Sequence, residues 1–135
     1  MSEVYSAVKN MNKLNSEWNA VCRHILKGYD ITYPQFRVLT GILELQQSNK
    51  RITQAQLSQH IGIDVMTLST IIRNLEARRL LRRQESRSDT RAKNVYLTAV
   101  GISLTEEVEP IIDQAAELFF EDYPATLLKV LSKLS

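Results

Sequence analysis

The chain of 135 residues has a single cysteine, only two histidines and no long apolar run. One cysteine cannot form an internal disulfide, which is typical of proteins from a reducing compartment. No stretch approaches the roughly 20 apolar residues that a membrane-spanning helix needs. The polar N-terminus also lacks the charged and apolar regions of a signal peptide. We therefore expect a cytoplasmic protein that does not interact with a membrane.

Residues that support catalysis or metal binding are also scarce. His24 and His60 are too few and too isolated for a metal site, and Cys22 and His24 point to different faces of a helix. The sequence has no phosphate-binding glycine loop, no nucleophile paired with a base and no paired acid motif. We expect neither a cofactor nor enzymatic activity.

Basic residues concentrate in one segment, although the net charge of the whole chain is only +2. Residues 73–93 contain eight basic and three acidic residues, a net charge of +5, so the remainder sums to −3. Residues 101–122 contain seven acidic residues and no basic one. This asymmetry indicates one surface suited to a polyanion.

The two ends of the chain have the apolar pattern of helices that pack on other helices. With 44% apolar residues, the length fits a single domain, residues 1–135, with its own core. The N-terminal seam repeats at intervals of four and three; it consists of Val4, Val8, Met11, Asn15, Trp18, Cys22, Ile25 and Tyr29. A C-terminal helix continues with Leu104, Val108, Ile111, Ala115 and Leu118, and a short amphipathic helix follows near 127–134.

One copy of the chain has too little surface to bury these seams. We therefore expect residues 1–28 and 101–135 to form a two-fold interface in a homodimer. Pro110 lies inside the C-terminal helix, removes a backbone donor and is expected to kink it.

Two consecutive helix starts in the middle of the chain predict a helix-turn-helix. Thr32-Tyr-Pro-Gln35 combines a capping threonine, a first-turn proline and a glutamine three residues after the cap, and Thr53-Gln-Ala-Gln56 repeats the device. Gly62 is placed as a left-handed helix stop, and Asp64 can cap the next helix. The short glycine-containing turn between the helix that starts after Thr53 and the helix that starts after Asp64 is typical of a helix-turn-helix.

The second helix of this unit has a small, polar outer face. Short hydroxyls, a methyl-contacting apolar residue and an arginine suit a helix that lies in the DNA major groove. The candidate residues are Val65, Met66, Thr67, Ser69, Thr70 and Arg73. Taken alone, this helix fits a solvated amphipathic helix better, because helix-turn-helix patterns are short and degenerate.

A basic hairpin follows directly. An arginine-rich strand and an alternating Asn-Val-Tyr-Leu strand flank a loop that carries Arg87, Arg91 and Lys93. Arginine on a narrow tip can enter the minor groove, and the Asp89 carboxylate can aim the guanidinium of Arg91 through a bidentate pair. The alternative is a salt-bridged surface loop. Its position beside the helix-turn-helix favours a second DNA contact.

The order of these elements resembles the multiple-antibiotic-resistance regulator (MarR) family over residues 31–104. The most specific motifs are Thr32-Tyr-Pro-Gln-Phe36 through Val38-Leu39, then Asp89-x-Arg91 followed by Leu97-Thr98-x-x-Gly101. The resemblance implies a mainly α fold with a small β-hairpin wing. The winged helix-turn-helix lobe would be residues 31–100, and residues 1–28 and 101–135 would be the dimerisation helices.

The resemblance also implies a function. The protein would be a homodimeric repressor or activator on double-stranded DNA, released by a small-molecule effector or an oxidant. Residues 65–73 would be the recognition segment and Arg91 the wing-tip contact in the minor groove. Two residues depart from the family pattern. Arg79 replaces a usual glycine, so either this arginine adopts a left-handed conformation or the turn differs. Thr70 replaces a common arginine.

Several alternatives stay open at this point. The candidate ligand cleft residues Trp18, Tyr29, Tyr33 and Phe36 are also ordinary core residues. Cys22 is a candidate redox sensor, although buried free cysteines are usually inert. A winged-helix module that binds a protein would have a neutral wing, and a non-specific architectural DNA binder would tolerate a scrambled site.

Overall fold

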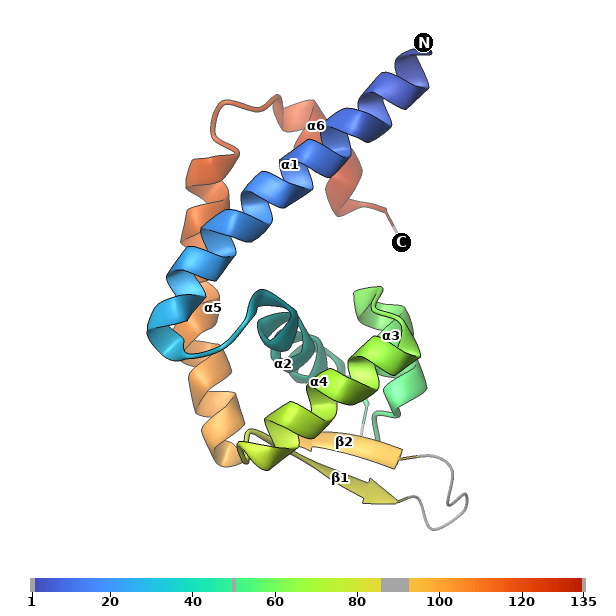
Figure 1. Cartoon of the computed structure of the whole chain (residues 1–135), viewed down its shortest axis with the longest axis vertical. Helices are drawn as coiled ribbons and strands as arrows, with labels where there is room; N and C mark the ends of the chain where they lie inside the picture. Colours follow the sequence, from blue (N-terminus) through green and yellow to red (C-terminus); the bar gives the residue numbers. More distant parts are fainter. Residues whose placement is uncertain (1, 50, 86–92, 135) are drawn as a thin grey trace.

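A computed structural model describes residues 2–49, 51–85 and 93–134. The elements follow the order α1 (Glu3–Leu26), η1 (Lys27–Tyr29), α2 (Tyr33–Gln46), α3 (Gln54–Ile61), α4 (Val65–Ala77), β1 (Leu81–Glu85), β2 (Lys93–Leu97), α5 (Ala99–Phe119) and α6 (Ala125–Ser132). Figure 1 shows α1, α6 and the end of α5 in the upper half, with α2, α3, α4 and the hairpin below them. The predicted fold class, mainly helical with a small hairpin, is confirmed.

The starts of α2 and α3 are fixed by the two predicted capping boxes. Thr32 Oγ1 accepts a hydrogen bond from the Gln35 amide at 3.1 Å, and Gln35 Oε1 accepts one from the Thr32 amide at 3.0 Å. Thr53 and Gln56 exchange the same two bonds at 3.1 and 2.9 Å. Each cap contributes about 1 kcal/mol to helix stability, so the sequence itself fixes where these two helices begin.

The turn between α3 and α4 is held by side chains as well as by backbone conformation. Gly62 has φ +72° and ends α3, as the sequence predicts. The Arg37 guanidinium on α2 donates to the carbonyl of Ile61, and Ser58 Oγ donates to the carbonyl of Ile63 at 2.5 Å. Side chains of α2 and α3 therefore help to fix the geometry of the turn.

The core surrounds α2, which packs against α1, α3, α4, α5 and β2. Almost every element contributes fully buried apolar side chains, which stabilise the fold by roughly 1.5–3 kcal/mol each. These side chains are Cys22 and Leu26 of α1, Val38, Leu39 and Ile42 of α2, Leu57 of α3, Leu68, Ile72 and Leu75 of α4, Leu81 and Val95 of the hairpin, and Val108 of α5.

The hairpin is anchored to the helical lobe through β2. The antiparallel register pairs Leu81 with Leu97, and both side chains are buried. On its other edge, β2 pairs with the segment before α3: the Val95 amide donates to the carbonyl of Ile52 at 2.8 Å. The base of the hairpin is therefore bonded to the N-terminal end of α3.

Of the two alternatives that the sequence leaves open at Arg79, the structure has the left-handed conformation, with φ +61°. This costs a residue with a side chain about 1–2 kcal/mol. The turn is stabilised by two hydrogen bonds, from the Leu80 amide to the carbonyl of Leu75 at 3.0 Å and from Thr98 Oγ1 to the carbonyl of Arg79 at 2.7 Å. The chain therefore passes from α4 to β1 with an arginine in the left-handed position.

Helix α5 has two apolar rows, where the sequence pattern predicted one seam. Gly101, Thr105, Val108 and Ile112 are buried within the chain. The neighbouring row is exposed; it includes Val100 (63%), Ile111 (37%) and Leu118 (63%). The assignment of Val108 to the unburied seam was therefore wrong, because Val108 is a core residue. The helix also continues unbroken through Pro110.

No helix among the described residues is long and apolar enough to cross a membrane.

Candidate DNA interface

The outer face of α4 gathers most of the predicted recognition residues. Met66 is 83% exposed and Val65 55% exposed. Thr67, Thr70 and Arg73 are exposed too, whereas Ser69 is half-buried. The opposite face of the helix is buried in the core. The helix thus presents a continuous surface of short polar, methyl-bearing and cationic groups.

Hydrogen bonds order this surface. Asp64 Oδ1 accepts from the Thr67 amide at 3.0 Å and Asp64 Oδ2 accepts from Thr67 Oγ1 at 2.6 Å. These bonds from Thr67 lower the pKa of the Asp64 carboxyl. Further along the helix, Arg73 Nη2 lies 3.5 Å from Thr70 Oγ1. The hydroxyl of Thr67 keeps its acceptor lone pairs available for an outside donor.

An ion pair joins the end of α4 to β1. The Arg83 guanidinium donates to Glu76 Oε1 through Nη2 at 2.9 Å and Nε at 3.2 Å, and the Arg83 amide donates to Glu76 Oε2 at 3.2 Å. The hydrogen bonds from Arg83 hold the pKa of the Glu76 carboxyl below its ordinary value. Sequence reasoning missed this pair, which holds β1 against the C-terminal part of α4.

We expect Glu76→Gln to lower the free energy of unfolding by about 1 kcal/mol at pH 7. Because the folded-state pKa of Glu76 is depressed, its contribution is present above the unfolded pKa of about 4.3 and is lost as the pH falls through the lower folded value. The difference between wild type and variant, measured by urea denaturation, should therefore shrink from pH 7 to pH 3. Glu107→Gln, an exposed site on α5, is the control. A difference that is the same at both pH values would contradict this role.

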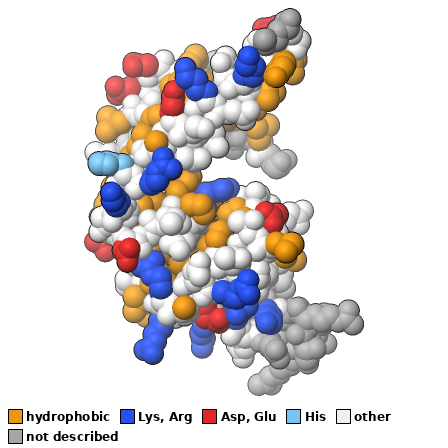
Figure 2. Space-filling view, viewed as in Figure 1, with side chains coloured by type: hydrophobic (Ala, Val, Ile, Leu, Met, Phe, Trp, Pro, Cys, Tyr) orange, Lys and Arg blue, Asp and Glu red, His pale blue; other side chains and the backbone are white. Residues whose placement is uncertain are grey.

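Most of the predicted wing-tip residues lie outside the described residues, namely Arg87, Asp89 and Arg91. Lys93 opens β2 and is exposed. On the outer face of the hairpin, the Arg82 guanidinium lies 5.5 Å from the centroid of the Tyr96 ring. Figure 2 shows Lys and Arg side chains on the lower half of this face, where Figure 1 places α4 and the hairpin.

A cleft of about 1240 Å³ opens between α1, the N-terminus of α2 and α4. It differs from the predicted ligand cleft, because Tyr33 is the only one of the four predicted aromatic residues that lines it. Phe36 is buried in the core, and Trp18 and Tyr29 pack against the core. Trp18 Nε1 donates to Tyr33 Oη at 2.9 Å and its ring contacts Phe119 and Phe120. None of these three side chains lines the cleft, so their part in ligand binding stays a prediction.

Cys22 is fully buried beneath this junction. Burial raises the pKa of its thiol to about 11, an effect that a hydrogen bond with Tyr33 only partly offsets. A thiol with so high a pKa holds its proton at neutral pH and is a poor nucleophile. The described residues also contain no group of His, Cys, Asp and Glu side chains suited to a metal ion.

A helix-turn-helix followed by a two-stranded hairpin defines a winged helix-turn-helix protein. Residues 29–92, which span α2, α3, α4 and β1, match the model of the MarR family. The winged helix-turn-helix lobe of the chain is therefore similar to that of the MarR family, a family of DNA-binding transcriptional regulators.

Solved structures of this family are similar over almost the whole chain. A MepR–DNA complex from S. aureus shares 27% identity, with 99% of each chain covered and a TM-score of 0.80. A cysteine-to-serine mutant of MarR from E. coli, in complex with operator DNA, shares 23% identity, covers 97% of this chain and 94% of its own, and has a TM-score of 0.82. BpsR from Bordetella bronchiseptica shares 22% identity, with 95% and 97% covered and a TM-score of 0.82.

Proposed function

We propose that the protein is a sequence-specific repressor that binds pseudo-palindromic double-stranded DNA as a homodimer. The observation that carries this proposal is the exposed face of α4, in which uncharged Val65, Met66 and Thr67 are followed by Arg73. Uncharged polar and apolar groups read base edges in the major groove, and arginine binds guanine or phosphate. The Glu76–Arg83 ion pair gives the wing a fixed position beside that helix.

Exposed apolar side chains support the homodimer. They gather on three helices and the residues after them at one end of the molecule; the most exposed are Val4, Tyr5 and Met11 of α1, Leu118 of α5, Val130 of α6, and Leu134, which follows α6. A second copy that packs on the same surfaces would bury them in a two-fold interface. Light scattering should therefore give the mass of a dimer at micromolar concentration. A stable monomer would contradict this part of the proposal.

A dimer sets the form of the DNA site. Two recognition helices must meet successive major grooves roughly 34 Å apart on one face of the duplex, which requires two related half-sites. Because Lys and Arg contacts to phosphate release counterions, affinity should fall steeply as salt rises. Scrambling one half-site at fixed salt separates sequence-specific binding from architectural binding: a specific regulator loses affinity, whereas a non-specific binder keeps it.

Arg91→Ala is expected to weaken binding to a selected DNA fragment by about tenfold or more, because one charged minor-groove contact per subunit is lost. Arg91 lies outside the described residues, so this prediction rests on its sequence position. The measurement is a shift assay at fixed salt, with Lys133→Ala, on the end of α6, as a charge-matched control. If both variants bind as tightly as wild type, the wing does not take part in recognition.

We further propose that a small-molecule effector releases the protein from DNA. The open cleft beside α4 supports it, because a ligand there would contact the recognition helix directly. In a similar protein, BpsR, DNA binding is regulated by 6-hydroxynicotinic acid. Oxidation of Cys22 is the less favoured signal, since its thiol is buried and its pKa is raised.

A further inference from the structure

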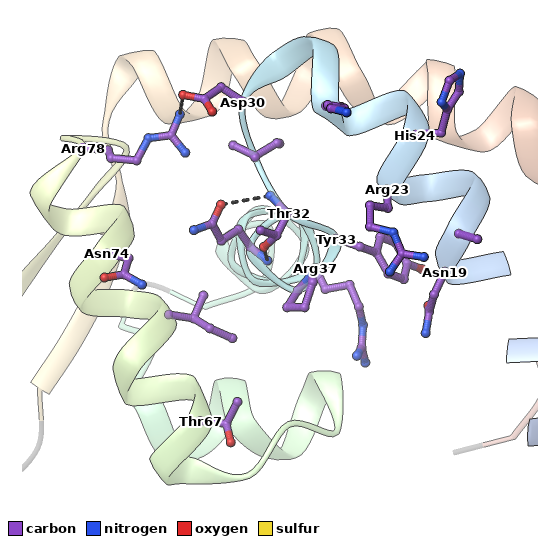
Figure 3. A pocket seen from close by; sticks show the side chains of 16 residues that line it. Asn19, Arg23, His24, Asp30, Thr32, Tyr33, Arg37, Thr67, Asn74 and Arg78 are labelled. Atoms are coloured by element: carbon purple, nitrogen blue, oxygen red, sulfur yellow. Dashed lines mark hydrogen bonds and ion pairs between the residues drawn. The ribbon is translucent and has the colours of Figure 1, made fainter. Parts of the chain in front are cut away.

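The cleft at the N-terminus of α2 is lined by side chains from α1, α2 and α4 and has an excess of positive charge. Helix α1 and the turn after it contribute Arg23 and Lys27, α2 contributes Arg37, and α4 and its C-cap contribute Asn74 and Arg78. Among the described residues, its only acidic lining residue is Asp30. Figure 3 shows Arg23 and Arg37 on the α1 side of the α2 N-terminus and Asn74 and Arg78 on the other side.

The positive charge in the cleft is only weakly compensated. Asp30 Oδ2 lies 3.8 Å from Arg78 Nη2, but the Asp30 side chain is fully exposed, so the pair contributes little. Within the described part of the chain, Arg23 and Lys27 form no ion pair. Arg37 donates to the carbonyl of Ile61, a neutral acceptor. The described lining of the cleft therefore holds four Lys and Arg side chains and one exposed carboxylate.

Charged side chains, more than the amides of the α2 N-terminus, are the donors available to a ligand. The Thr32 and Gln35 amides already donate within the capping box, and Pro34 has no N–H. Guanidinium groups bind carboxylate and phosphate through paired, charge-assisted hydrogen bonds. With Arg23 on one side and Arg78 on the other, the cleft offers two separate positions for an oxyanion.

We propose that this cleft binds a small metabolite with two oxyanionic groups, such as a bisphosphate or a di- or tricarboxylate, which bridges α1 and α4. One group pairs with Arg23 and Lys27, and the other with Arg78 and Asn74. Such a ligand restrains the recognition helix relative to α1 and thereby changes DNA affinity. This regulatory consequence rests on the proposed DNA-binding function, whereas ligand binding itself does not.

Binding can be followed through the single tryptophan, because Trp18 is hydrogen-bonded to Tyr33, which lines the cleft. Fluorescence and calorimetric titrations at constant ionic strength would use fructose 1,6-bisphosphate, pyrophosphate and citrate. Fructose 6-phosphate, which has one phosphate fewer than the bisphosphate, is the ligand control. We expect saturable binding of at least one of the three probes, and at least tenfold weaker binding of the monophosphate than of the bisphosphate if the bisphosphate binds. Absence of saturable binding for all three overturns the proposal.

Variants test whether the binding is in the cleft. Arg23→Gln combined with Arg78→Gln should raise the Kd of the bound probe at least tenfold. Lys9→Gln combined with Lys13→Gln removes the same charge from exposed positions of α1 outside the cleft and should leave the Kd unchanged. Circular dichroism checks that both variants are folded. Equal weakening in the two double variants indicates attraction by net charge alone and overturns the proposal.

The phosphate groups of the DNA backbone are the alternative occupants of this cleft. A shift assay at fixed ionic strength distinguishes DNA phosphate from a small-molecule ligand. The proposal is supported if the bound probe changes the DNA affinity of wild type but not that of Arg23→Gln/Arg78→Gln. It is overturned if wild type binds no probe and that variant loses DNA affinity, since the cleft then serves the DNA backbone. Probe binding without DNA binding would support the ligand site and contradict the proposed function, so the two failures are distinguishable.

Discussion

A Gly101→Ala variant is expected to lose about 3 kcal/mol or more of its free energy of unfolding, at the upper end of the cost of overpacking. A Cβ atom at this position would lie 2.0 Å from the carbonyl oxygen of Leu80 and 3.0 Å from its carbonyl carbon. That carbonyl also accepts a hydrogen bond from the Thr98 amide at 3.1 Å. The chain therefore cannot relieve the clash without separating the start of α5 from the start of β1.

Gly28→Ala is the matched control for this prediction. A Cβ atom at Gly28 would meet nothing within 4 Å among the described residues, so its free energy of unfolding should change by less than about 0.5 kcal/mol. Urea denaturation at pH 7 measures both variants. If Gly101→Ala unfolds at the same urea concentration as Gly28→Ala, the close approach of α5 to the Leu80 carbonyl is not a constraint on the fold.

Replacing Leu118 by glutamate is expected to convert the dimer into monomers and to weaken binding to a two-half-site DNA fragment by about 10²-fold or more. Leu118 is 63% exposed on α5, so in the proposed dimer a charge there would be buried against the partner. Two linked recognition helices gain their affinity from binding the second half-site intramolecularly, and a monomer loses this gain. Light scattering measures the mass, and a shift assay measures the affinity.

Leu118→Met keeps the apolar surface and should remain dimeric. Thermal unfolding followed by circular dichroism shows whether each variant is folded. A Leu118→Glu protein that is still dimeric and binds the fragment with wild-type affinity would exclude this face of α5 from the interface.

The parts of the fold that depend on local sequence are the parts that the sequence predicts. The capping boxes at Thr32 and Thr53 and the left-handed stop at Gly62 each involve groups within a few residues, and the structure confirms all three. At Arg79, where the sequence left a left-handed residue and a different turn open, the structure has φ +61°. Local backbone chemistry determines these features, so it also fixes where α4 begins and where its exposed face lies.

Contacts between distant segments were not predictable in the same way. The bond from Arg37 to the Ile61 carbonyl and the pair of Glu76 with Arg83 depend on how elements pack in three dimensions. Arginine and glutamate on exposed-looking positions give no sequence signal for such partners. The lining of the cleft was missed for the same reason, since it combines side chains from α1, α2 and α4.

Helix periodicity alone also does not assign an apolar row to a partner. On α5 the rows that contain Val108 and Leu118 lie side by side, and both are apolar. The packing of α5 against α1, α2 and β2 determines which row is internal. The exposed row is therefore defined by what the chain leaves uncovered, and this is the surface that the Leu118 variants test.

The hydrogen bond from the Val95 amide to the Ile52 carbonyl has a consequence for how any signal can be transmitted. It ties the base of the hairpin to the residue before the N-cap of α3, while Glu76 and Arg83 tie it to α4. We therefore expect the base of the wing and the helix-turn-helix to move together as one rigid body. In a dimer, an effector would therefore change the distance between the two winged helix-turn-helix lobes and hence the half-site spacing that they match. The internal geometry of each lobe would stay unchanged.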